Sequence, residues 1–447
     1  MNSALHLVVG LGKTGHSIAR YLTRHAKPFV VFDTRTAPVG LNEFQDEFPG
    51  IDIFLGDLPQ TIFSQLKAVI TSPGVALDHP VMQKAIALHI PVYGDIECLA
   101  REIDAPVVAI TGTNGKSTVT TLVGEMAKAD GLSVMVAGNI GQPVLDALAN
   151  NIHYNLWVLE LSSFQLDLTT SLAPIAATIL NITPDHLDRH HTFEAYVAAK
   201  QRVYHNAQYI LYNRDDQWTQ PNPRLNINAV ICNYGLDEPA DGEWGLKIVD
   251  GTTYLAYGQD CILPVDAMRI KGRHNWANAL AACALAHAAG ISIASMKKVL
   301  EDFSGLPHRT QWVRSLDGVD WINDSKGTNI GATISAISGL GGSMQGKIVL
   351  IAGGQGKGAD FQELQPAMAE YVRSLVLIGE DADKLEQALS DVVGVSRAES
   401  LEQAIGIARE LAKPGDIVLL SPACASLDMF RDYNHRGEVF TAMVDSL

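Results

Sequence analysis

Cysteine is scarce in this sequence and never paired. The 447 residues contain five cysteines and no C-x-x-C motif. An odd, scattered set argues against a disulfide framework and indicates free thiols in a reducing cytosol. The cysteines are Cys98, Cys232, Cys261, Cys283 and Cys424.

Long hydrophobic runs and a leader segment are also missing. No uninterrupted apolar stretch approaches the roughly 20 residues that cross a bilayer. The N-terminus enters a strand pattern almost at once, without the basic segment and long apolar run of a secretory signal. We therefore expect a cytoplasmic protein that is not inserted in a membrane.

Positive charge is in deficit. The chain has 33 Lys and Arg against 49 Asp and Glu, a net charge of −16. This balance argues against a nucleic-acid partner, because phosphate backbones require clustered positive charge. Small anionic ligands remain possible, since a few N–H groups and cations suffice for them. The hydrophobic content of 47% with 18% charged residues is that of a folded globular protein.

Strand-like and helical patterns alternate along almost the whole chain, which predicts parallel sheets with crossover helices. The length exceeds that of one ordinary domain. We expect an α/β protein with three domains in series, over residues 1–93, 94–305 and 306–447. The first and third are expected to be Rossmann-like and the central one P-loop ATPase-like. Residues 233–270, rich in Gly, Asp and Tyr, predict antiparallel hairpins added to the central sheet.

The first nucleotide-type loop is GLGKTG, between a predicted strand and a predicted helix. Gly10, Gly12 and Gly15 match G-x-G-x-x-G, and Asp33 ends the next strand. Glycines let the backbone approach a pyrophosphate at the helix N-terminus, and the acid can bind a ribose hydroxyl. The pattern is typical of a dehydrogenase, but the TR dipeptide after the acid suits a uridine diphosphate equally. A tight strand–helix turn without any ligand is the third interpretation.

The second loop, GTNGKST, follows the apolar strand VVAIT. Lys116 and Ser117 open the helix after it. The lysine can reach the β- and γ-phosphates of a nucleotide, and the hydroxyl can bind magnesium. Ile110 occupies the position of the first glycine in G-x-x-x-x-G-K-[ST]. The loop is therefore shortened, and Gly112, Gly115 and consecutive backbone amides are expected to cradle the phosphates.

Acidic and histidine residues follow the next strands. Glu160 ends the strand NLWVLE, at the edge where open α/β sheets bind ligands, and can hold magnesium. NITPDHLDRHH places several candidate ligands after another strand. No cysteine accompanies them, and their spacing matches no standard zinc pattern. Within this segment we expect a role for His186 alone and interpret most of the residues as solvated loop.

Two separate loops imply two nucleotide-bearing substrates. A dehydrogenase needs one dinucleotide and no Lys-Ser magnesium loop, so that alternative is disfavoured. The last third of the chain adds LPHR, NDSKGTN, GGQGKGADF and SPACASLDMF. Their cations Arg309, Lys326 and Lys357, at strand ends, suit a transferring phosphoryl group and an acidic co-substrate.

In this combination the chain resembles the Mur ligases, ATP-dependent amide-bond-forming enzymes of bacterial peptidoglycan precursor synthesis. The matching motifs run in order over essentially the whole length: GLGKTG with DTR, SPG, GDIE, GTNGKST, GNIG, LELSSFQL, DHLDRH, AAK, HNxxNA, LPHR, NDSKxTN, GGxxKGxDF and SPACASLDMF. The resemblance implies that ATP activates the L-alanine carboxylate of UDP-N-acetylmuramoyl-L-alanine as an acyl phosphate, which D-glutamate then attacks. ADP and phosphate are the by-products, and we expect a monomer.

The resemblance also implies roles for individual residues. The UDP-sugar is expected on Gly12, Lys13, Thr14, Asp33, Thr34, Arg35, Ser72, Pro73, Gly74, Asn139 and His186. ATP is expected on Gly112, Thr113, Asn114, Gly115, Lys116, Ser117, Thr118, Asn275, Asn278, Arg309, Asp324 and Lys326. One magnesium ion is expected on Ser117 and Glu160, and a second on His186 and Lys200. D-Glutamate is expected on Thr328, Lys357 and Ser426, and catalysis to depend on Lys116, His186, Lys200 and Lys326. Two positions depart from the family pattern: His191 stands where glycine is common, and Gly327 where alanine is common.

Lys200 needs a chemical change to bind a metal. A cationic lysine cannot bind magnesium, because hard cations take oxygen ligands. The resemblance suggests that CO₂ adds to the amine and gives a carbamate. Only the neutral amine reacts, and with an ordinary pKa that form is roughly one molecule in 2,500 at pH 7. We therefore expect a lowered pKa or trapping by neighbouring cations, and in either case a partly buried lysine.

Three alternatives stay open at this point. The folylpolyglutamate synthetases share the loop and the type of ligase reaction, but a first domain specific for a UDP-sugar distinguishes this chain from them. A dehydrogenase would transfer hydride with NAD. A non-catalytic nucleotide-binding regulator is disfavoured because every catalytic position is occupied.

Lys116→Ala tests which loop is catalytic. We expect it to abolish ATP-dependent ligation, because a positioned cation is lost where transition-state charge is greatest. Loss of one such electrostatic donor commonly costs about 10²–10³ in rate. Turnover of the purified variant measures this, and near-normal activity would mean that the second loop is not the catalytic one.

Overall fold

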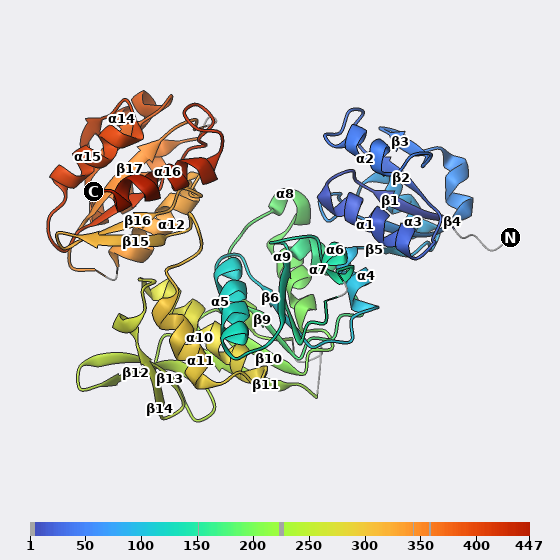
Figure 1. Ribbon diagram of the computed structural model, residues 1–447, viewed down its shortest axis with the longest axis horizontal. Coiled ribbons are helices and arrows are strands. Elements are labelled where there is room, and N and C mark those ends of the chain that lie inside the picture. Colours follow the sequence, from blue (N-terminus) through green and yellow to red (C-terminus); the bar gives the residue numbers. More distant parts are fainter. Residues whose placement is uncertain (1–4, 151, 223–227, 343, 357–358) are drawn as a thin grey trace. The chain divides into compact units, whose positions relative to one another are not determined.

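The computed structural model describes residues 5–150, 152–222, 228–342, 344–356 and 359–447. The chain forms two compact units. The first comprises Met1–Gly245, Tyr257–Asp260 and Leu280–Met296, and the second Leu246–Ala256, Cys261–Ala279 and Lys297–Leu447. Three sheets, one from each third of the chain, confirm the predicted α/β architecture (Figure 1).

The N-terminal sheet is five-stranded and entirely parallel, in the order β3-β2-β1-β4-β5. Because β1 lies between β2 and β4, the strand order reverses there, and such switch points are where open sheets bind ligands. The elements are β1 (Leu5–Val9), α1 (Lys13–Arg24), β2 (Phe29–Asp33), α2 (Leu41–Glu47), β3 (Ile53–Leu55), η1 (Gln60–Gln65), β4 (Leu66–Thr71), α3 (Pro80–Ala87) and β5 (Val92–Tyr93).

The central sheet has nine strands in the order β14-β13-β12-β11-β10-β9-β6-β8-β7. From β11 to β7 all neighbours are parallel, so their carboxyl ends share one edge. The GTNGKST loop after β6 therefore lies beside the segments after β8 and β9. These strands are β6 (Val107–Thr111), β7 (Val134–Gly138), β8 (Leu156–Glu160), β9 (Ala176–Ile179), β10 (Tyr209–Asn213) and β11 (Val230–Tyr234).

The predicted hairpins in residues 233–270 are present. The strands β12 (Trp244–Val249), β13 (Thr252–Tyr257) and β14 (Asp260–Pro264) follow one another with two-residue connections, which join antiparallel neighbours. The helices of the central third are α4 (Asp95–Ala100), α5 (Lys116–Ala129), α6 (Val144–Leu148), α7 (Ser163–Asp167), α8 (Leu187–His190), α9 (Phe193–Gln201), η2 (Arg202–Tyr204), η3 (Gln217–Thr219), η4 (Val265–Ala267), α10 (Arg273–Ala288) and α11 (Ile293–Asp302).

The C-terminal sheet has six strands in the order β15-β16-β20-β17-β18-β19. An antiparallel hairpin, β15 with β16, forms one edge, which the sequence pattern did not predict, and the other pairs are parallel. The elements are β15 (Gln311–Leu316), β16 (Val319–Asn323), α12 (Ile330–Gly341), β17 (Ile348–Gly353), η5 (Phe361–Leu364), α13 (Gln365–Tyr371), β18 (Val372–Ile378), α14 (Ala382–Leu389), β19 (Gly394–Arg397), α15 (Leu401–Leu411), β20 (Ile417–Leu420) and α16 (Tyr433–Asp445).

The C-terminal sheet is buried on both faces. Along β17, Ile348 and Leu350 belong to one apolar cluster, while Val349 and Ile351 belong to a second one. Side chains alternate across a strand, so an uninterrupted apolar strand requires cover on both sides. This explains why the strands read as continuous hydrophobic runs.

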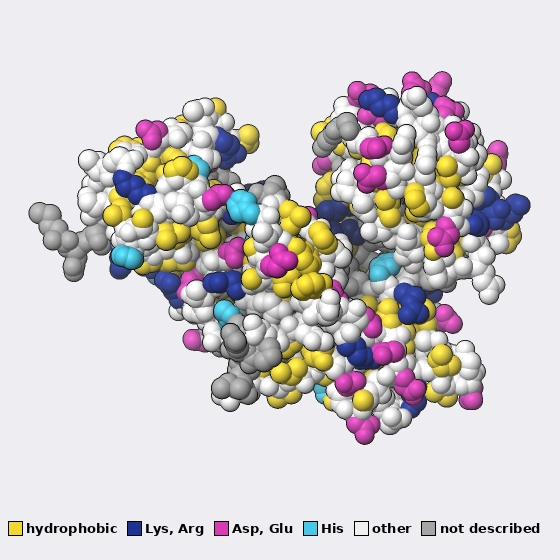
Figure 2. Space-filling view, turned by 180° about the vertical axis from the view of Figure 1, so that it is seen from behind, with side chains coloured by type: hydrophobic (Ala, Val, Ile, Leu, Met, Phe, Trp, Pro, Cys, Tyr) yellow, Lys and Arg dark blue, Asp and Glu magenta, His cyan; other side chains and the backbone are white. Residues whose placement is uncertain are grey.

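The surface matches the composition. Figure 2 shows acidic and basic side chains mixed over the face in view, without a continuous basic area. Within the described ranges, no helix combines the length and apolar character needed to span a bilayer.

Candidate active site

The ends of three strands in the N-terminal sheet line one cavity. The loops after β1, β2 and β4 border about 410 Å³, a size typical of small-ligand sites. Gly10 permits this closeness, because a Cβ there would lie 2.9 Å from Ser72 Oγ. The cavity brings together most of the residues predicted for the UDP-sugar, namely Gly12, Lys13, Thr14, Asp33, Thr34, Arg35, Ser72, Pro73 and Gly74.

Asp33 organises the charge of this cavity. Its buried carboxylate accepts hydrogen bonds from the backbone N–H of Leu11 at 2.7 Å and from Arg35 Nε and Nη2 at 2.8 Å each. Burial by itself would raise the pKa of Asp33, but the hydrogen bonds from Arg35 and Leu11 outweigh it and lower that pKa. The carboxylate therefore stays ionised at neutral pH. Arg35, with a side chain 54% exposed, remains accessible to a ligand.

The second loop is shaped by two glycines with positive φ. Gly112 has φ +151° and Gly115 has φ +81° directly before α5. A Cβ on Gly112 would lie 3.1 Å from Leu180, so the loop lies tightly against the segment after β9. Lys116 folds back over the loop and donates from Nζ to the carbonyls of Gly112 at 2.9 Å and Thr113 at 2.8 Å.

Lys200 is buried beside this loop, as its predicted chemistry requires. Its side chain is only 2% exposed, and Nζ donates to the Gly112 carbonyl at 2.8 Å. The amine also lies 4.7 Å from the centre of the Tyr196 ring. Burial, followed by repulsion from Lys116, lowers the pKa of Lys200 to about 7. About half of the amine is then neutral at pH 7, instead of one molecule in thousands.

Glu160 carries an unsatisfied buried oxygen. Oε1 accepts a hydrogen bond from Asn139 Nδ2 at 2.9 Å, whereas Oε2 is buried without a hydrogen-bond partner. A buried carboxylate oxygen without a partner is costly, so this atom fits a cation ligand. Ser117, the other predicted ligand of the same ion, is buried at the start of α5. This helix follows β6, which pairs with the strand β8 that ends at Glu160. In the described part of the chain, no group of three His, Cys, Asp or Glu side chains gathers as a ready metal site.

The histidine-rich segment after β9 divides into exposed and buried parts. His186 has φ +51°, lies 3.5 Å from the Asp185 carboxylate and is half exposed. His190 is buried instead, stacked on Phe164 with Nε2 2.9 Å from Ser163 Oγ. His190 is therefore an exception to the predicted solvated loop, because its packing partners come from a distant part of the sequence.

The structure shows the local conformation at the two positions that depart from the family pattern. His191 has φ +66°, in the left-handed region, which is why glycine suits this position. At Gly327 a Cβ would lie 2.6 Å from Asp324 Oδ2 and 2.7 Å from Ser421 Oγ. An alanine here would require the Asp324 and Ser421 side chains to shift.

In the second unit, Asp324 is the most constrained of the predicted nucleotide residues. It is buried, and it accepts hydrogen bonds from the Thr310 N–H at 3.0 Å and from Ser421 Oγ at 2.7 Å. Burial raises the pKa of Asp324 to about 6 although these hydrogen bonds oppose the shift. The side chain is therefore held in one orientation between two loops.

The other predicted residues of the second unit differ in exposure. Arg309 and Lys326 are exposed, and the Lys326 amine lies 5.4 Å from the centre of the Tyr433 ring. On α10, Asn278 Nδ2 donates to Asn275 Oδ1 at 3.3 Å. Of the three residues predicted for D-glutamate, Ser426 is buried, Thr328 is partly buried and Lys357 lies outside the described residues.

Two residues that contact the second loop were not predicted from the sequence. Tyr196 donates or accepts a hydrogen bond with Thr113 Oγ1 at 3.1 Å, and Asn181 bonds to the backbone of Asn114. No sequence motif singles out Tyr196, which lies in a helix one turn before Lys200. The position of Asn181 could have indicated a role, because it lies at the carboxyl edge of the sheet beside a buried strand, as Glu160 does.

Three family models match the chain. Residues 4–94 match the MurD-like N-terminal domain of Mur ligases, residues 110–286 the Mur ligase middle domain, and residues 308–424 the glutamate ligase domain of Mur ligases. The matched order is that of the three sheets.

Curated relatives are similar over the full length. A UDP-N-acetylmuramoylalanine–D-glutamate ligase of Legionella pneumophila strain Paris is 66% identical over 447 residues, which cover 100% of both chains. The ligase of the same name from Hahella chejuensis is 49% identical over 440 residues, 98% of both chains.

Solved structures share the fold at low identity. A UDP-N-acetylmuramoyl-L-alanyl-D-glutamate–2,6-diaminopimelate ligase is 17% identical with a TM-score of 0.59, covering 99% of this chain and 92% of the other. The UDP-N-acetylmuramate–alanine ligase of Thermotoga maritima is 16% identical with a TM-score of 0.55, covering 99% of both.

Arg35→Ala and Asp33→Ala test the N-terminal cavity. We expect both to raise the KM for the UDP-substrate and leave the KM for ATP nearly unchanged, because binding remote from the reacting atoms affects KM more than kcat. Asp33→Ala also leaves the buried Leu11 N–H without its acceptor, so its thermal stability should fall as well.

Steady-state kinetics and thermal unfolding separate these effects. Arg269→Ala is the matched control, since Arg269 is 51% exposed and pairs only loosely with Asp302, at 3.9 Å. A rise in the KM for ATP instead would mean that the two loops have been assigned the wrong way round.

Proposed function

The chain belongs to the Mur ligase family, and we propose that it joins D-glutamate to the L-alanine carboxylate of UDP-N-acetylmuramoyl-L-alanine, converting ATP to ADP and phosphate. The full-length similarity to ligases named for this substrate and this amino acid supports the reaction. It places the chain in peptidoglycan precursor synthesis.

The observation that carries the proposal is the presence of two nucleotide-type loops at the carboxyl ends of parallel strands in two separate sheets. The cavity of about 410 Å³ around Asp33 and Arg35 suits a uridine diphosphate. The loop after β6 presents a helix start and the amine of Lys116, which suit the phosphates of ATP. One dinucleotide would need only one of these loops.

The three sheets suggest a division of labour. We assign residues 1–93 to the UDP-sugar, 94–305 to ATP and 306–447 to the incoming amino acid. Thr328, Lys357 and Ser426 are assigned to D-glutamate, and Asn275, Asn278, Arg309, Asp324 and Lys326 complete the ATP site. The protein is assigned to the cytoplasm as a monomer.

The reaction needs activation because a carboxylate is a poor acyl donor. Transfer of the γ-phosphoryl group from ATP to the alanine carboxylate forms an acyl phosphate and releases ADP. The amine of D-glutamate then attacks the carbonyl carbon and loses a proton, and phosphate leaves from the tetrahedral intermediate. Phosphoryl transfer depends mainly on positioning and charge neutralisation. Lys116 and Lys326 supply that charge from the protein.

Magnesium fits the oxygen donors beside the loop. When bound, it neutralises phosphate charge and orients the phosphoryl group. The unpartnered Oε2 of Glu160 and the hydroxyl of Ser117 would hold one ion, and His186 with a carbamylated Lys200 would hold a second. Asn139 orients Glu160 by its hydrogen bond to Oε1.

Carbamylation of Lys200 follows from its surroundings. The reaction joins the amine nitrogen to the carbon of CO₂ and releases one proton. It needs a neutral amine, which burial and Lys116 provide by lowering the pKa of Lys200 to about 7. The carbamate replaces a buried cation with an anion next to Lys116, so the electrostatic repulsion between the two amines becomes an attraction.

Phosphate release from ATP tests the proposed reaction. Purified protein with UDP-N-acetylmuramoyl-L-alanine should release phosphate in the presence of D-glutamate and not with L-glutamate, L-alanine or diaminopimelate. Product formation is confirmed by mass spectrometry. Release that depends on a folate substrate would instead assign the chain to the folylpolyglutamate synthetases.

Lys200→Ala tests the carbamate. We expect a nearly inactive enzyme that regains activity when formate or acetate is supplied, because a small carboxylate can occupy the space of the lost carbamate and restore its oxygen ligand. Lys128→Ala is the control, since that amine is half exposed on α5 and pairs with Glu125. A fully active alanine variant, or no rescue by either acid, would contradict the carbamate.

A further inference from the structure

A short segment directly after β9, residues 180–183, fastens the phosphate loop to its neighbouring strand. The Leu180 N–H donates to the Thr111 carbonyl at 3.0 Å, and the Thr113 N–H donates to the Asn181 carbonyl at 2.9 Å. The Thr183 N–H donates to Thr113 Oγ1 at 3.1 Å. These hydrogen bonds therefore tie the last residue of β6 and the second residue of the loop to this segment.

The side chain of Asn181 adds a reciprocal pair. Its Oδ1 accepts from the Asn114 N–H at 2.8 Å, and its Nδ2 donates to the Asn114 carbonyl at 3.1 Å. These two backbone groups belong to the peptide planes on either side of Asn114. One carboxamide therefore fixes both planes immediately before Gly115, where the chain turns with φ +81° into α5. With both ends of its carboxamide engaged, Asn181 is placed to act through the loop.

This arrangement changes the expected phosphate cradle. The N–H groups of Thr113 and Asn114 donate to Asn181, so these two are not among the consecutive amides that can cradle the phosphates. The first N–H groups of a helix have no partner within it, and an anion is favoured there. The cradle is therefore the start of α5, and the loop before it sets the direction of that start.

The segment is held equally from its other side. At the end of β10, Asn213 Nδ2 donates to the Leu180 carbonyl at 3.0 Å, and three residues later Asp216 Oδ2 accepts from the Ile182 N–H at 2.8 Å. These bonds bracket Asn181, because they bind the residues directly before and after it. In the sheet, β9 lies between β10 and β6, so the restraint passes from strand to strand.

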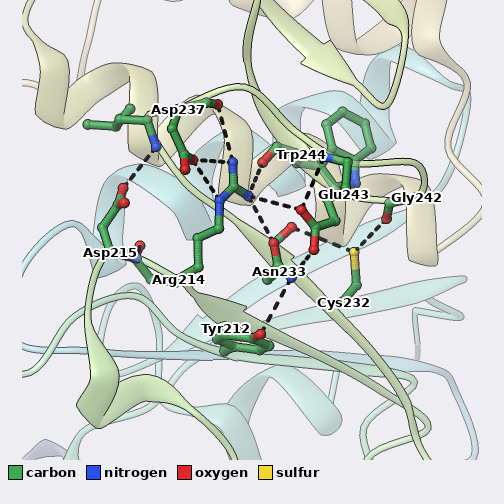
Figure 3. A network of polar contacts seen from close by, with 12 residues as sticks. Tyr212, Arg214, Asp215, Cys232, Asn233, Asp237, Gly242, Glu243 and Trp244 are labelled. Atoms are coloured by element: carbon green, nitrogen blue, oxygen red, sulfur yellow. Dashed lines mark hydrogen bonds and ion pairs between the residues drawn. The ribbon is translucent and has the colours of Figure 1, made fainter.

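The turn that supplies these two side chains is itself anchored, as Figure 3 shows. Arg214 Nη1 donates to the Trp244 carbonyl at 2.8 Å, and Nε donates to Asp237 Oδ1 at 2.7 Å. Asp215 Oδ2 accepts from the Leu236 N–H at 2.8 Å. The sequence NRDD, residues 213–216, thus ties two residues to the segment after β9 and two to the loop after β11.

We propose that Asn181 is a positioning residue for nucleotide binding, which holds the phosphate loop in its binding shape, and that Asn213 and Asp216 keep Asn181 in place. The proposal rests on the assignment of this loop to ATP. Without the carboxamide, the two peptide planes can rotate and only part of the population presents α5 correctly. The apparent affinity for the nucleotide then falls in proportion to the fraction of molecules whose loop has the binding conformation.

Calorimetric titration with MgADP and steady-state kinetics test this role in the full-length protein. Asn181→Ala should weaken MgADP binding and raise the KM for ATP by about tenfold, the size expected for two lost hydrogen bonds. The KM values for the UDP-substrate and D-glutamate should stay unchanged, which a general loss of structure would not allow. Asn155→Ala is the matched control, since its Oδ1 accepts from the Ser133 N–H at 2.9 Å, away from the loop.

Thermal unfolding of each variant shows that the comparison is between folded proteins. If Asn181→Ala does not fold, Asp216→Asn decides, because it keeps the shape but leaves one acceptor oxygen for the two N–H groups of Ile182 and Trp218. A weaker MgADP affinity supports the proposal. Unchanged MgADP affinity in a folded variant, or an equal loss in Asn155→Ala, overturns it. If the wild-type protein binds MgADP but forms no product, only the proposed reaction is refuted. The calorimetric comparison does not require turnover, so it still tests the role of Asn181.

Discussion

Two lysine amines converge on a single carbonyl oxygen, that of Gly112, and the chemistry of the central site depends on this contact. Lys116 approaches from α5 and Lys200 from α9, each within hydrogen-bond distance of the same atom. Two neighbouring ammonium groups repel each other, and the Lys200 amine is buried as well. The protein relieves the conflict by making one amine easy to deprotonate. A large share of the Lys200 amine is therefore neutral at pH 7, whereas the Lys116 amine donates to the carbonyls of Gly112 and Thr113.

This contact exists only because the sheet is parallel. β6 and β9 end at the same edge, so the loop after β6 and the helix that follows β9 meet there. Glu160 reaches this edge from β8, on the other side of β6. A parallel sheet thus collects groups that are far apart in sequence, and most of the site consists of strand ends. The N-terminal sheet uses the same device, with Asp33 at the end of β2 and Ser72 after β4.

Sequence patterns were sufficient for the architecture and for the residues that stand in motifs. Glycine loops, apolar strands and the acids after them predicted the three sheets, the Asp33 cavity and the neighbourhood of Lys116, because each signal is local. The burial of His190 and the edge strand β15 escaped prediction, since both depend on partners elsewhere in the chain. Asn181 escaped for a related reason. A single asparagine after a strand is common, and only the register between β6 and β9 shows that it meets the loop.

The shortened loop has a consequence for how its motif should be understood. In a longer phosphate loop, additional local residues can help to fix the path of the backbone. Here a neighbouring segment sets that path through Asn181, and residues after β10 support the segment in turn. The shape is therefore a property of the sheet and not of the seven letters GTNGKST. A peptide of residues 107–127, or the same letters grafted onto another scaffold, would carry the motif without its conformation. The smallest unit that contains the hydrogen bonds shaping this loop is three adjacent strands, β6, β9 and β10, with the segments that follow them.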